Sequence, residues 1–251
     1  MTAGKYGVKK VIDLSDWGRP IARLVARFLK EKPISVIQIT NLHLLLAIFC
    51  SWLILQEEMI IACALLVVKG VIDAVDGELA RIRQRPSHVG RYWDTVADSI
   101  GLVSVMVCFG LSFNWHPLIT GAIILATLLQ YSLFNHYSIM MRSLSLGDIT
   151  SRLDERIRPE AYPWEKQSNV DIFHSIYLLF FNWQDRIISF LAGKDSTKLS
   201  FQLTVSSYLG YGMQSLVILI LALSENLNYL PELILGVNMS IMTLVILSNR
   251  I

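Results

Sequence analysis

Charged residues are scarce in this chain of 251 residues. Only 17% of the residues are Asp, Glu, Lys or Arg, whereas soluble globular domains carry about 25%. Hydrophobic residues make up 53%, and the mean hydropathy is +0.49. This balance argues against an ordinary soluble domain and favours an integral membrane protein. The formal net charge of +2 is by itself uninformative, and we expect no nucleic-acid partner.

Cysteine is also rare, and its placement argues against two kinds of site. Cys50, Cys63 and Cys108 each lie inside an apolar run and form no Cys-x-x-Cys pair. A thiolate zinc site or a disulfide framework is therefore not expected, and we interpret the cysteines as small packing residues. A signal peptide is not expected either, because the first long apolar run begins only near Ile34.

Long apolar runs, in contrast, are abundant. Crossing the hydrocarbon core of a membrane requires about 20 mostly apolar residues. The sequence therefore predicts an all-α integral membrane protein with six transmembrane helices. It contains no internal repeat or low-complexity linker, so we expect a single domain over residues 1–251. The six predicted spans cover residues 35–56, 59–79, 95–113, 117–141, 200–224 and 230–248.

Two further segments are amphipathic, and we expect them to lie at the membrane interface rather than to span it. Residues 13–31, in the predicted cytoplasmic segment 1–33, combine an apolar face with a basic face that we assign to anionic lipid. Residues 171–192, between the fourth and fifth spans, mix large apolar side chains with polar ones. The first apolar face comprises Trp17, Ile21, Leu24, Val25 and Phe28, and the basic face comprises Arg19, Arg23, Arg27 and Lys30.

The basic residues predict the orientation. Eight Lys or Arg lie in residues 1–33, four in 81–91 and eight in 142–199, whereas the alternate connections hold none. By the positive-inside rule, these three segments and both termini face the cytoplasm. We therefore expect a protein of the cytoplasmic membrane, or its equivalent, with an even number of spans.

Four aspartates stand at the cytoplasmic ends of the second and third spans: Asp73, Asp76, Asp94 and Asp98. Carboxylates inside membrane spans are costly and usually functional. Spacings of three and four residues place each pair on one helical face. A short basic turn makes the two helices antiparallel neighbours, so we expect the four carboxylates to converge.

Converging carboxylates repel one another unless cations neutralise them. Oxygen ligands without a Cys or His cluster favour Mg²⁺, or Mn²⁺, over zinc. Two such ions would balance the four charges and leave positions for phosphate oxygens, as a phosphoryl-transfer site requires. No chemistry is assigned to the scattered histidines, which are His43, His88, His116, His136 and His174.

Small residues and an arginine stand between the aspartates. Gly77, Ala80 and Gly90 permit close approach of helices or of a ligand, and helix packing is a sufficient explanation for each taken singly. Arg81 lies on the same helical face as Asp73 and is suited to pair with phosphate oxygens.

Together these residues resemble the signature of the CDP-alcohol phosphotransferase family. All eight fixed positions match, and a chance match at a given start is on the order of 10⁻¹⁰. Ser87, three residues before Gly90, also resembles a residue common in that family. The matching run is Asp73-x₂-Asp76-Gly77-x₂-Ala80-Arg81-x₈-Gly90-x₃-Asp94-x₃-Asp98.

The resemblance implies a mechanism. A CDP-linked alcohol binds in a polar cavity open to the cytoplasm, with two metal ions held on its diphosphate by Asp73, Asp76, Asp94 and Asp98. Asp98 is also the general base that activates the acceptor hydroxyl, and CMP leaves. The resemblance further implies a homodimer. The expected contacts to the CMP portion are Gly77, Ala80, Arg81, Ser87 and Gly90.

The substrates remain open at this point. We favour CDP-diacylglycerol as donor and a small polar acceptor such as inositol phosphate, glycerol phosphate or serine. The alternative is a small CDP-alcohol that donates to a lipid hydroxyl. Outside this class, a divalent-cation transporter would need polar groups that continue toward the outer half of the membrane, and a catalytically silent scaffold would not need the intact motif.

Weaker patterns add three candidate substrate contacts. Asn41 opens the first span, where relatives often have Pro-Asn; a capping or interhelical asparagine is the alternative. Lys69 lies one turn before Asp73 and faces either an anionic substrate or a carboxylate. Arg142 follows the fourth span in a run that loosely resembles relatives accepting a phosphorylated polyol; an ordinary positive-inside arginine is the alternative.

Overall fold

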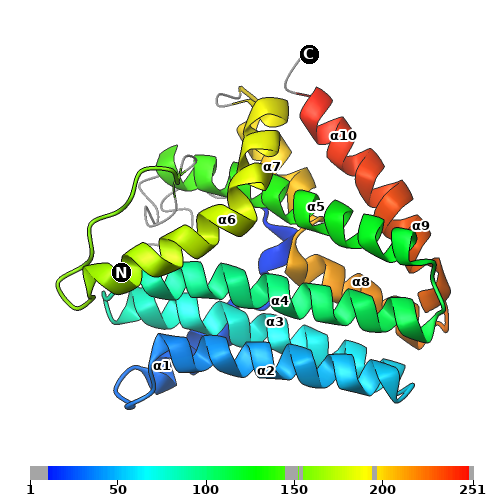
Figure 1. Ribbon diagram of the computed structural model, residues 1–251, viewed down its shortest axis with the longest axis horizontal. Coiled ribbons are helices and arrows are strands. Elements are labelled where there is room, and N and C mark those ends of the chain that lie inside the picture. Colours follow the sequence, from blue (N-terminus) through cyan, green and yellow to red (C-terminus); the bar gives the residue numbers. More distant parts are fainter. Residues whose placement is uncertain (1–10, 145–151, 153–154, 194–196, 249–251) are drawn as a thin grey trace.

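The computed structural model describes residues 11–144, 152, 155–193 and 197–248. Within them all regular structure is helical. Helices α2 (Val36–Leu55), α3 (Met59–Ile82) and α4 (His88–Ser112) run side by side, and α2 packs against both of the others (Figure 1). The other elements are η1 (Leu14–Asp16), α1 (Arg19–Leu29), α5 (Pro117–Leu144), α6 (Gln167–Ala192), α7 (Leu199–Ser207), α8 (Tyr211–Leu223), η2 (Leu227–Tyr229), α9 (Leu230–Glu232), the π-helical η3 (Leu233–Asn238) and α10 (Met239–Leu247).

Local sequence signals fix where these helices begin and end. Helix α2 begins with a capping box, in which Ser35 accepts from the Gln38 amide and the Gln38 side chain accepts from the Ser35 amide. Glu57 adopts a left-handed backbone (φ 64°) in the tight turn to α3. Helix α4 begins at His88, because Ser87 caps it. It therefore starts seven residues before the predicted span 95–113.

Five helical segments are long and apolar enough to cross a membrane: α2, α4, α5, Leu199–Leu223 and Leu227–Leu247. These support an integral membrane protein and match five of the six predicted spans. The exception is α3, in which every 18-residue stretch contains Lys69, Asp73 and Asp76. Asp73 and Asp76 are the predicted metal ligands of this helix, and Lys69 is a predicted substrate contact.

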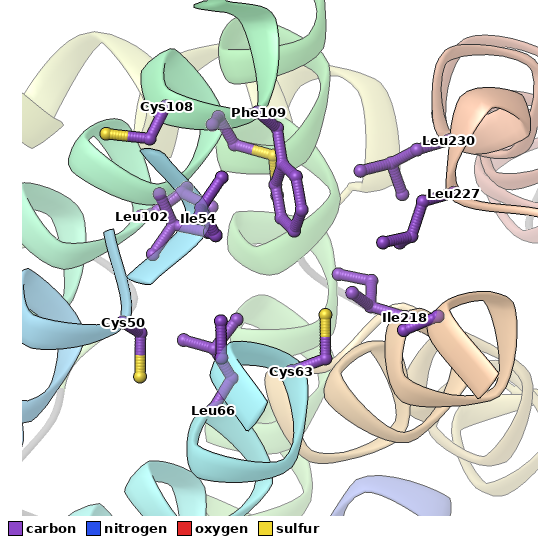
Figure 2. Close-up of a cluster of buried hydrophobic side chains, with 14 of the residues drawn as sticks. Cys50, Ile54, Cys63, Leu66, Leu102, Cys108, Phe109, Ile218, Leu227 and Leu230 are labelled. Carbon is purple, nitrogen blue, oxygen red and sulfur yellow. The ribbon is translucent and has the colours of Figure 1, made fainter. Parts of the chain in front are cut away.

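A buried apolar cluster joins α2, α3, α4, α5 and α8 on the side away from these charges. Figure 2 shows Cys50, Cys63 and Cys108 in this cluster together with Phe109 and Ile218. All three cysteines are buried and free, as expected of small packing residues. The cluster ties the helices together and leaves the polar end for the site.

The predicted span 200–224 is not one continuous helix. It breaks between α7 and α8, where Gly210 is extended (φ −72°, ψ 154°). The N-terminal segment fills the break: Ser15 Oγ accepts from the Gly212 amide at 3.0 Å, and Trp17 Nε1 donates to the Gly212 carbonyl at 2.9 Å. A Cβ on Gly212 would clash with the Ser15 backbone. In Figure 1 this segment is the dark blue stretch near the centre, beside α8.

The predicted amphipathic helix 13–31 is correspondingly shorter in the structure. Only Arg19–Leu29 forms α1, because Asp13–Gly18 follows the path beside α8. Helix α1 packs on α3 through Ala22 and Ala26, whereas Ile21, Leu24 and Phe28 are exposed. The large apolar side chains of α1 therefore point away from the protein.

Candidate active site

The four predicted aspartates line one cavity of about 390 Å³. Helix α3 supplies Asp73 and Asp76, and the neighbouring α4 supplies Asp94 and Asp98. Gly77 and Arg81 line the same cavity. The predicted convergence of two helical faces is therefore present in the fold.

A histidine from α2 lies among these carboxylates. His43 has no exposed surface. Its Nε2 atom lies 3.2 Å from Asp94 Oδ1, 3.6 Å from Asp73 Oδ1 and 4.0 Å from Asp76 Oδ2. Its Nδ1 atom lies 3.8 Å from Asp98 Oδ1. The imidazole thus approaches all four aspartates.

Helix α2 also contributes Thr40, one turn before His43. The Thr40 hydroxyl donates to Asp76 Oδ2 at 2.7 Å, in a fully buried contact. This bond orients the Asp76 carboxylate and satisfies one of its lone pairs.

Lys69 forms a direct ion pair with Asp98. The lysine is buried, and its ammonium group lies over the Tyr211 ring at 4.3 Å from the centroid. Of the two possibilities raised by the sequence, the structure places Lys69 on a carboxylate. Asp98 itself is partly exposed to the cavity, with 40% of its side-chain surface accessible.

A second polar cluster lies near the C-terminal end of α3, around the buried Glu78. Arg19 Nη1 lies 2.5 Å from Glu78 Oε1, and Arg81 Nη2 lies 3.1 Å from the same oxygen. Arg19 also pairs with Asp16, and both residues line the cavity with Arg81. The prediction that Arg19 belongs to a lipid-facing basic surface is therefore wrong, because Arg19 forms an ion pair with the buried Glu78 instead.

Ser87 and Gly90 form the N-terminus of α4. Ser87 Oγ accepts from the Gly90 amide at 2.8 Å and donates to Glu165 Oε1 at 2.7 Å. Glu165 also accepts from the amides of His88 and Val89. Ser87 therefore has a capping role in the structure besides its expected contact with CMP.

The wall opposite the aspartates comes from α5, α6 and α8. Polar groups on this wall are Ser132, Asn135, Gln184 and Asp185, and aromatic groups are Tyr131, Phe134, Tyr177, Phe181 and Tyr211. Ser132 donates to Gln184 at 2.8 Å, and Tyr177 donates to Asp185 at 2.8 Å. This wall offers hydrogen bonds to a small polar ligand.

Six predicted substrate contacts lie outside the lining of this cavity: Ala80, Ser87, Gly90, Asn41, Lys69 and Arg142. Asn41 accepts a hydrogen bond from Trp93 Nε1 at 2.7 Å on the exposed side of α2. Arg142, near the end of α5, donates to the Ser138 carbonyl at 3.3 Å. Ala80 lies on α3 one residue before Arg81 but does not line the cavity. The structure thus separates Asn41 and Arg142 from the aspartates.

The chemistry of the donor set fits a divalent cation. Donor atoms of His43, Asp73, Asp76 and Asp94 all lie within 4.8 Å of one another. Lys69 is the cation paired with Asp98, so the cluster keeps excess negative charge among the described residues. Cations bound by these oxygens would remove it.

A family model described as CDP-alcohol phosphatidyltransferase matches residues 36–192, which run from the start of α2 to the end of α6. The chain belongs to this family. CDP-alcohol phosphatidyltransferases are transferases of substituted phosphate groups and depend on divalent metal. A search of the curated proteins found no match. The matched region contains all four aspartates and Arg81, while α1, α7, α8 and α10 lie outside it.

Arg19 and His43 are among the site residues that were not predicted from the sequence of this CDP-alcohol phosphatidyltransferase. In the sequence, Arg19 cannot be distinguished from the other arginines of the predicted amphipathic helix. Only the fold shows its ion pair with Glu78. His43 has a detectable signal, because Thr40, His43 and Ala47 recur at helical spacing and form one buried face. A polar stripe of this kind on an otherwise apolar span indicates contact with other polar groups.

Proposed function

We propose that this protein transfers a phosphatidyl group from CDP-diacylglycerol to a small polar acceptor, releasing CMP, with Mg²⁺ as the natural cation. The observation that carries the proposal is the convergence of Asp73, Asp76, Asp94 and Asp98 on one cavity in a member of this family. Inositol phosphate, glycerol phosphate and serine are the acceptors to test. The polar wall of Ser132, Asn135 and Gln184 supports a small acceptor rather than a lipid one.

The four aspartates would hold two metal ions, Mg²⁺ or Mn²⁺. Bound there, the ions would neutralise the diphosphate and the charge that develops on the departing CMP. Arg81, at the same end of α3, would bind a phosphate oxygen as a planar donor. Gly77, Ala80, Ser87 and Gly90 would border the CMP portion.

Asp98 would act as the general base. It faces the cavity, and its carboxylate forms an ion pair with the Lys69 ammonium group. The acceptor hydroxyl would give its proton to the Asp98 carboxylate, and its oxygen would attack the phosphorus that carries the alcohol. The phosphoanhydride bond from that phosphorus to the CMP oxygen then breaks, so a new phosphate ester replaces a phosphoanhydride and CMP leaves.

We also propose six membrane spans, with α3 as the sixth. Its charged side chains Lys69, Asp76 and Glu78 are buried inside the protein, whereas Ile60, Ile61 and Val68 are exposed. The exposed apolar side chains of α1 and α6, such as Phe28 and Leu179, support interfacial placement of these helices. The positive-inside rule then places the site and both termini in the cytoplasm. The homodimer and the single domain stay predictions.

The test of the proposal is product formation by the purified protein with Mg²⁺ and CDP-diacylglycerol, offered serine, glycerol 3-phosphate and inositol phosphate in turn. We expect CMP and a new phospholipid with one of the three acceptors. Asp98→Asn should reduce formation of both products by at least about 100-fold, while Asp171→Asn, on α6 outside the cavity, should retain it. Products only from a small CDP-alcohol and a lipid hydroxyl would reverse the donor and acceptor, and no CMP from either class would refute the proposal.

A further inference from the structure

His43 is the only nitrogen ligand candidate within the aspartate cluster of the described residues. It lies on a third helix, α2, which packs against both of the helices that carry the aspartates. Neighbouring His43 on the same face are Thr40, which binds Asp76, and the small Ala47. The buried face of α2 therefore presents its polar side chains to the carboxylates.

The distances around Nε2 suit ligands of one ion. In an octahedral shell with bonds of about 2.1 Å, adjacent ligand atoms are about 3.0 Å apart and opposite ones about 4.2 Å. From His43 Nε2, the separations to Asp94, Asp73 and Asp76 oxygens are 3.2, 3.6 and 4.0 Å. All three separations lie between the values for adjacent and opposite ligands of one ion.

The second nitrogen supplies an independent observation. His43 Nδ1 is wholly buried and has no hydrogen-bond partner in the part of the chain that the structure describes. It points toward Asp98 Oδ1, 3.8 Å away. A histidine that binds a metal through one nitrogen commonly donates its other N–H to a carboxylate. His43 Nδ1 lies near Asp98 but beyond hydrogen-bond distance, so such a donation would require the two groups to move closer.

We propose that His43 Nε2 is a direct ligand of the ion held by Asp73, Asp76 and Asp94, with Nδ1–H directed at Asp98. The inference rests on the metal site of the proposed function and adds to it. The centre would then have mixed nitrogen and oxygen ligands. Imidazole favours transition ions, whereas Mg²⁺ favours oxygen alone. We therefore expect Mn²⁺ to bind this site more tightly than Mg²⁺, and His43 to be responsible for part of that preference.

The direct test is pulsed electron paramagnetic resonance of the wild-type protein loaded with Mn²⁺. We expect modulation from a coupled ¹⁴N nucleus, which changes to the ¹⁵N pattern when the histidines are ¹⁵N-labelled. His43→Gln should remove the nitrogen signal. His136→Gln is the matched control, because His136 is also buried in a span but binds the Gly193 carbonyl instead.

Metal titration gives a second measurement. Loss of an outer partner of a metal ligand typically weakens binding about 10- to 100-fold, so loss of a direct ligand should weaken Mn²⁺ at least about tenfold. Mg²⁺ affinity should fall by a smaller factor in His43→Gln. An equal fall for both ions would indicate a purely structural role and overturn the inference.

The outcomes separate this inference from the proposed function. If Mn²⁺ binds, is lost in Asp73→Asn, but shows no nitrogen coupling, His43 is not a ligand and the aspartate site stands. If the nitrogen signal persists in His43→Gln, another residue supplies it and the inference is wrong. If Mn²⁺ binds the wild type no better than Asp73→Asn, both the inference and the metal site fail.

Discussion

Lys69 and Asp98 form an ion pair in which the lysine is buried and the aspartate faces the cavity. In Lys69→Met the apolar stem is kept and the charge is lost. Since a base displaced by about 1 Å can cost about 100-fold in rate, we expect kcat to fall by about that factor. The loss of unfolding free energy should stay below about 3 kcal/mol, because cavity water reaches Asp98. Measured kcat, KM and thermal unfolding test this, with the exposed Lys30→Met as control. An unchanged kcat would contradict the positioning role.

Thr40 is the hydrogen-bond donor to Asp76, and valine has the same shape without the hydroxyl. Thr40→Val should weaken Mn²⁺ binding by about 10- to 100-fold, because the Asp76 carboxylate loses the partner that orients it. Calorimetric titration measures the change. Thr127→Val is the matched control: its hydroxyl is equally buried but binds only the Ile123 carbonyl of its own helix. Equal affinities in the two variants would refute the role of Thr40.

Single functional residues can be predicted from the sequence when they carry a charge within an apolar run. Asp73 and Asp94 stand out because a carboxylate within an apolar run needs a reason. His43 and Arg19 do not stand out, because both residue types are common on the surface of a helix. Only the packing of α2 and α1 on α3 reveals their contacts.

Among the helices, the break between α7 and α8 depends on Gly210 and Gly212. Neither has a side chain, so Ser15 of the N-terminal segment can pack closely against both. In Gly212→Ala the new methyl group would meet the Ser15 backbone, so the segment must shift. We expect a loss of about 1–3 kcal/mol in unfolding free energy, as for other overpacked sites, and faster proteolysis near Ser15. Gly121→Ala is the control, because its Cβ would meet no atom within 4 Å. Equal stability of both variants would show that Ser15 does not need this close approach.

Glu155 connects the segment before α6 to α4. It pairs with Arg91, with an Oε2–Nη2 distance of 2.8 Å, and accepts from the Arg152 amide at 2.7 Å. Burial opposes its charged form, but the hydrogen bonds and charge of Arg91 outweigh burial, so the pKa of Glu155 lies below its usual value. A lowered folded-state pKa stabilises the fold above the unfolded value of 4.5, and this contribution disappears as the pH falls through the folded-state pKa.

Glu155→Gln should therefore destabilise the protein by about 3 kcal/mol at pH 7, because Arg91 loses its buried partner. Below pH 4.5 the difference from the wild type should shrink. Denaturant unfolding at pH 7 and at several lower values measures it, with the exposed Glu160→Gln as control. A difference that is independent of pH would exclude the ion pair as its source.

Helix positions were largely predictable, and helix interruptions were not. The predicted spans 35–56 and 117–141 agree with α2 and α5 within three residues, because the length of the apolar run determines both. The break before α8 and the π-helical turn η3 lie inside stretches that the sequence predicts as single spans. The first follows from the insertion of Ser15 from the far end of the chain, which no local pattern reveals.

Across the described residues of the whole molecule, a few charged side chains are buried and many large apolar ones are exposed. Lys69, Asp76 and Glu78 are buried, while Leu179 and Phe190 are largely exposed. This is the reverse of a soluble protein and suits a lipid surrounding. The four aspartates and the buried Lys69 lie where α2, α3 and α4 meet. The energetic cost of burying charge therefore falls at the site that the motif identifies.

The measurement that tests the central claim most directly is CMP release from CDP-diacylglycerol, with acceptor present, as Mg²⁺ is titrated. We predict saturable release that EDTA abolishes and Mg²⁺ restores. Asp98→Asn should reduce it by about 10²- to 10⁴-fold, the usual contribution of a general base, while Asp171→Asn should leave it unchanged. Release that persists in EDTA, or that survives in Asp98→Asn at the wild-type rate, would contradict a metal-dependent transfer at the four aspartates.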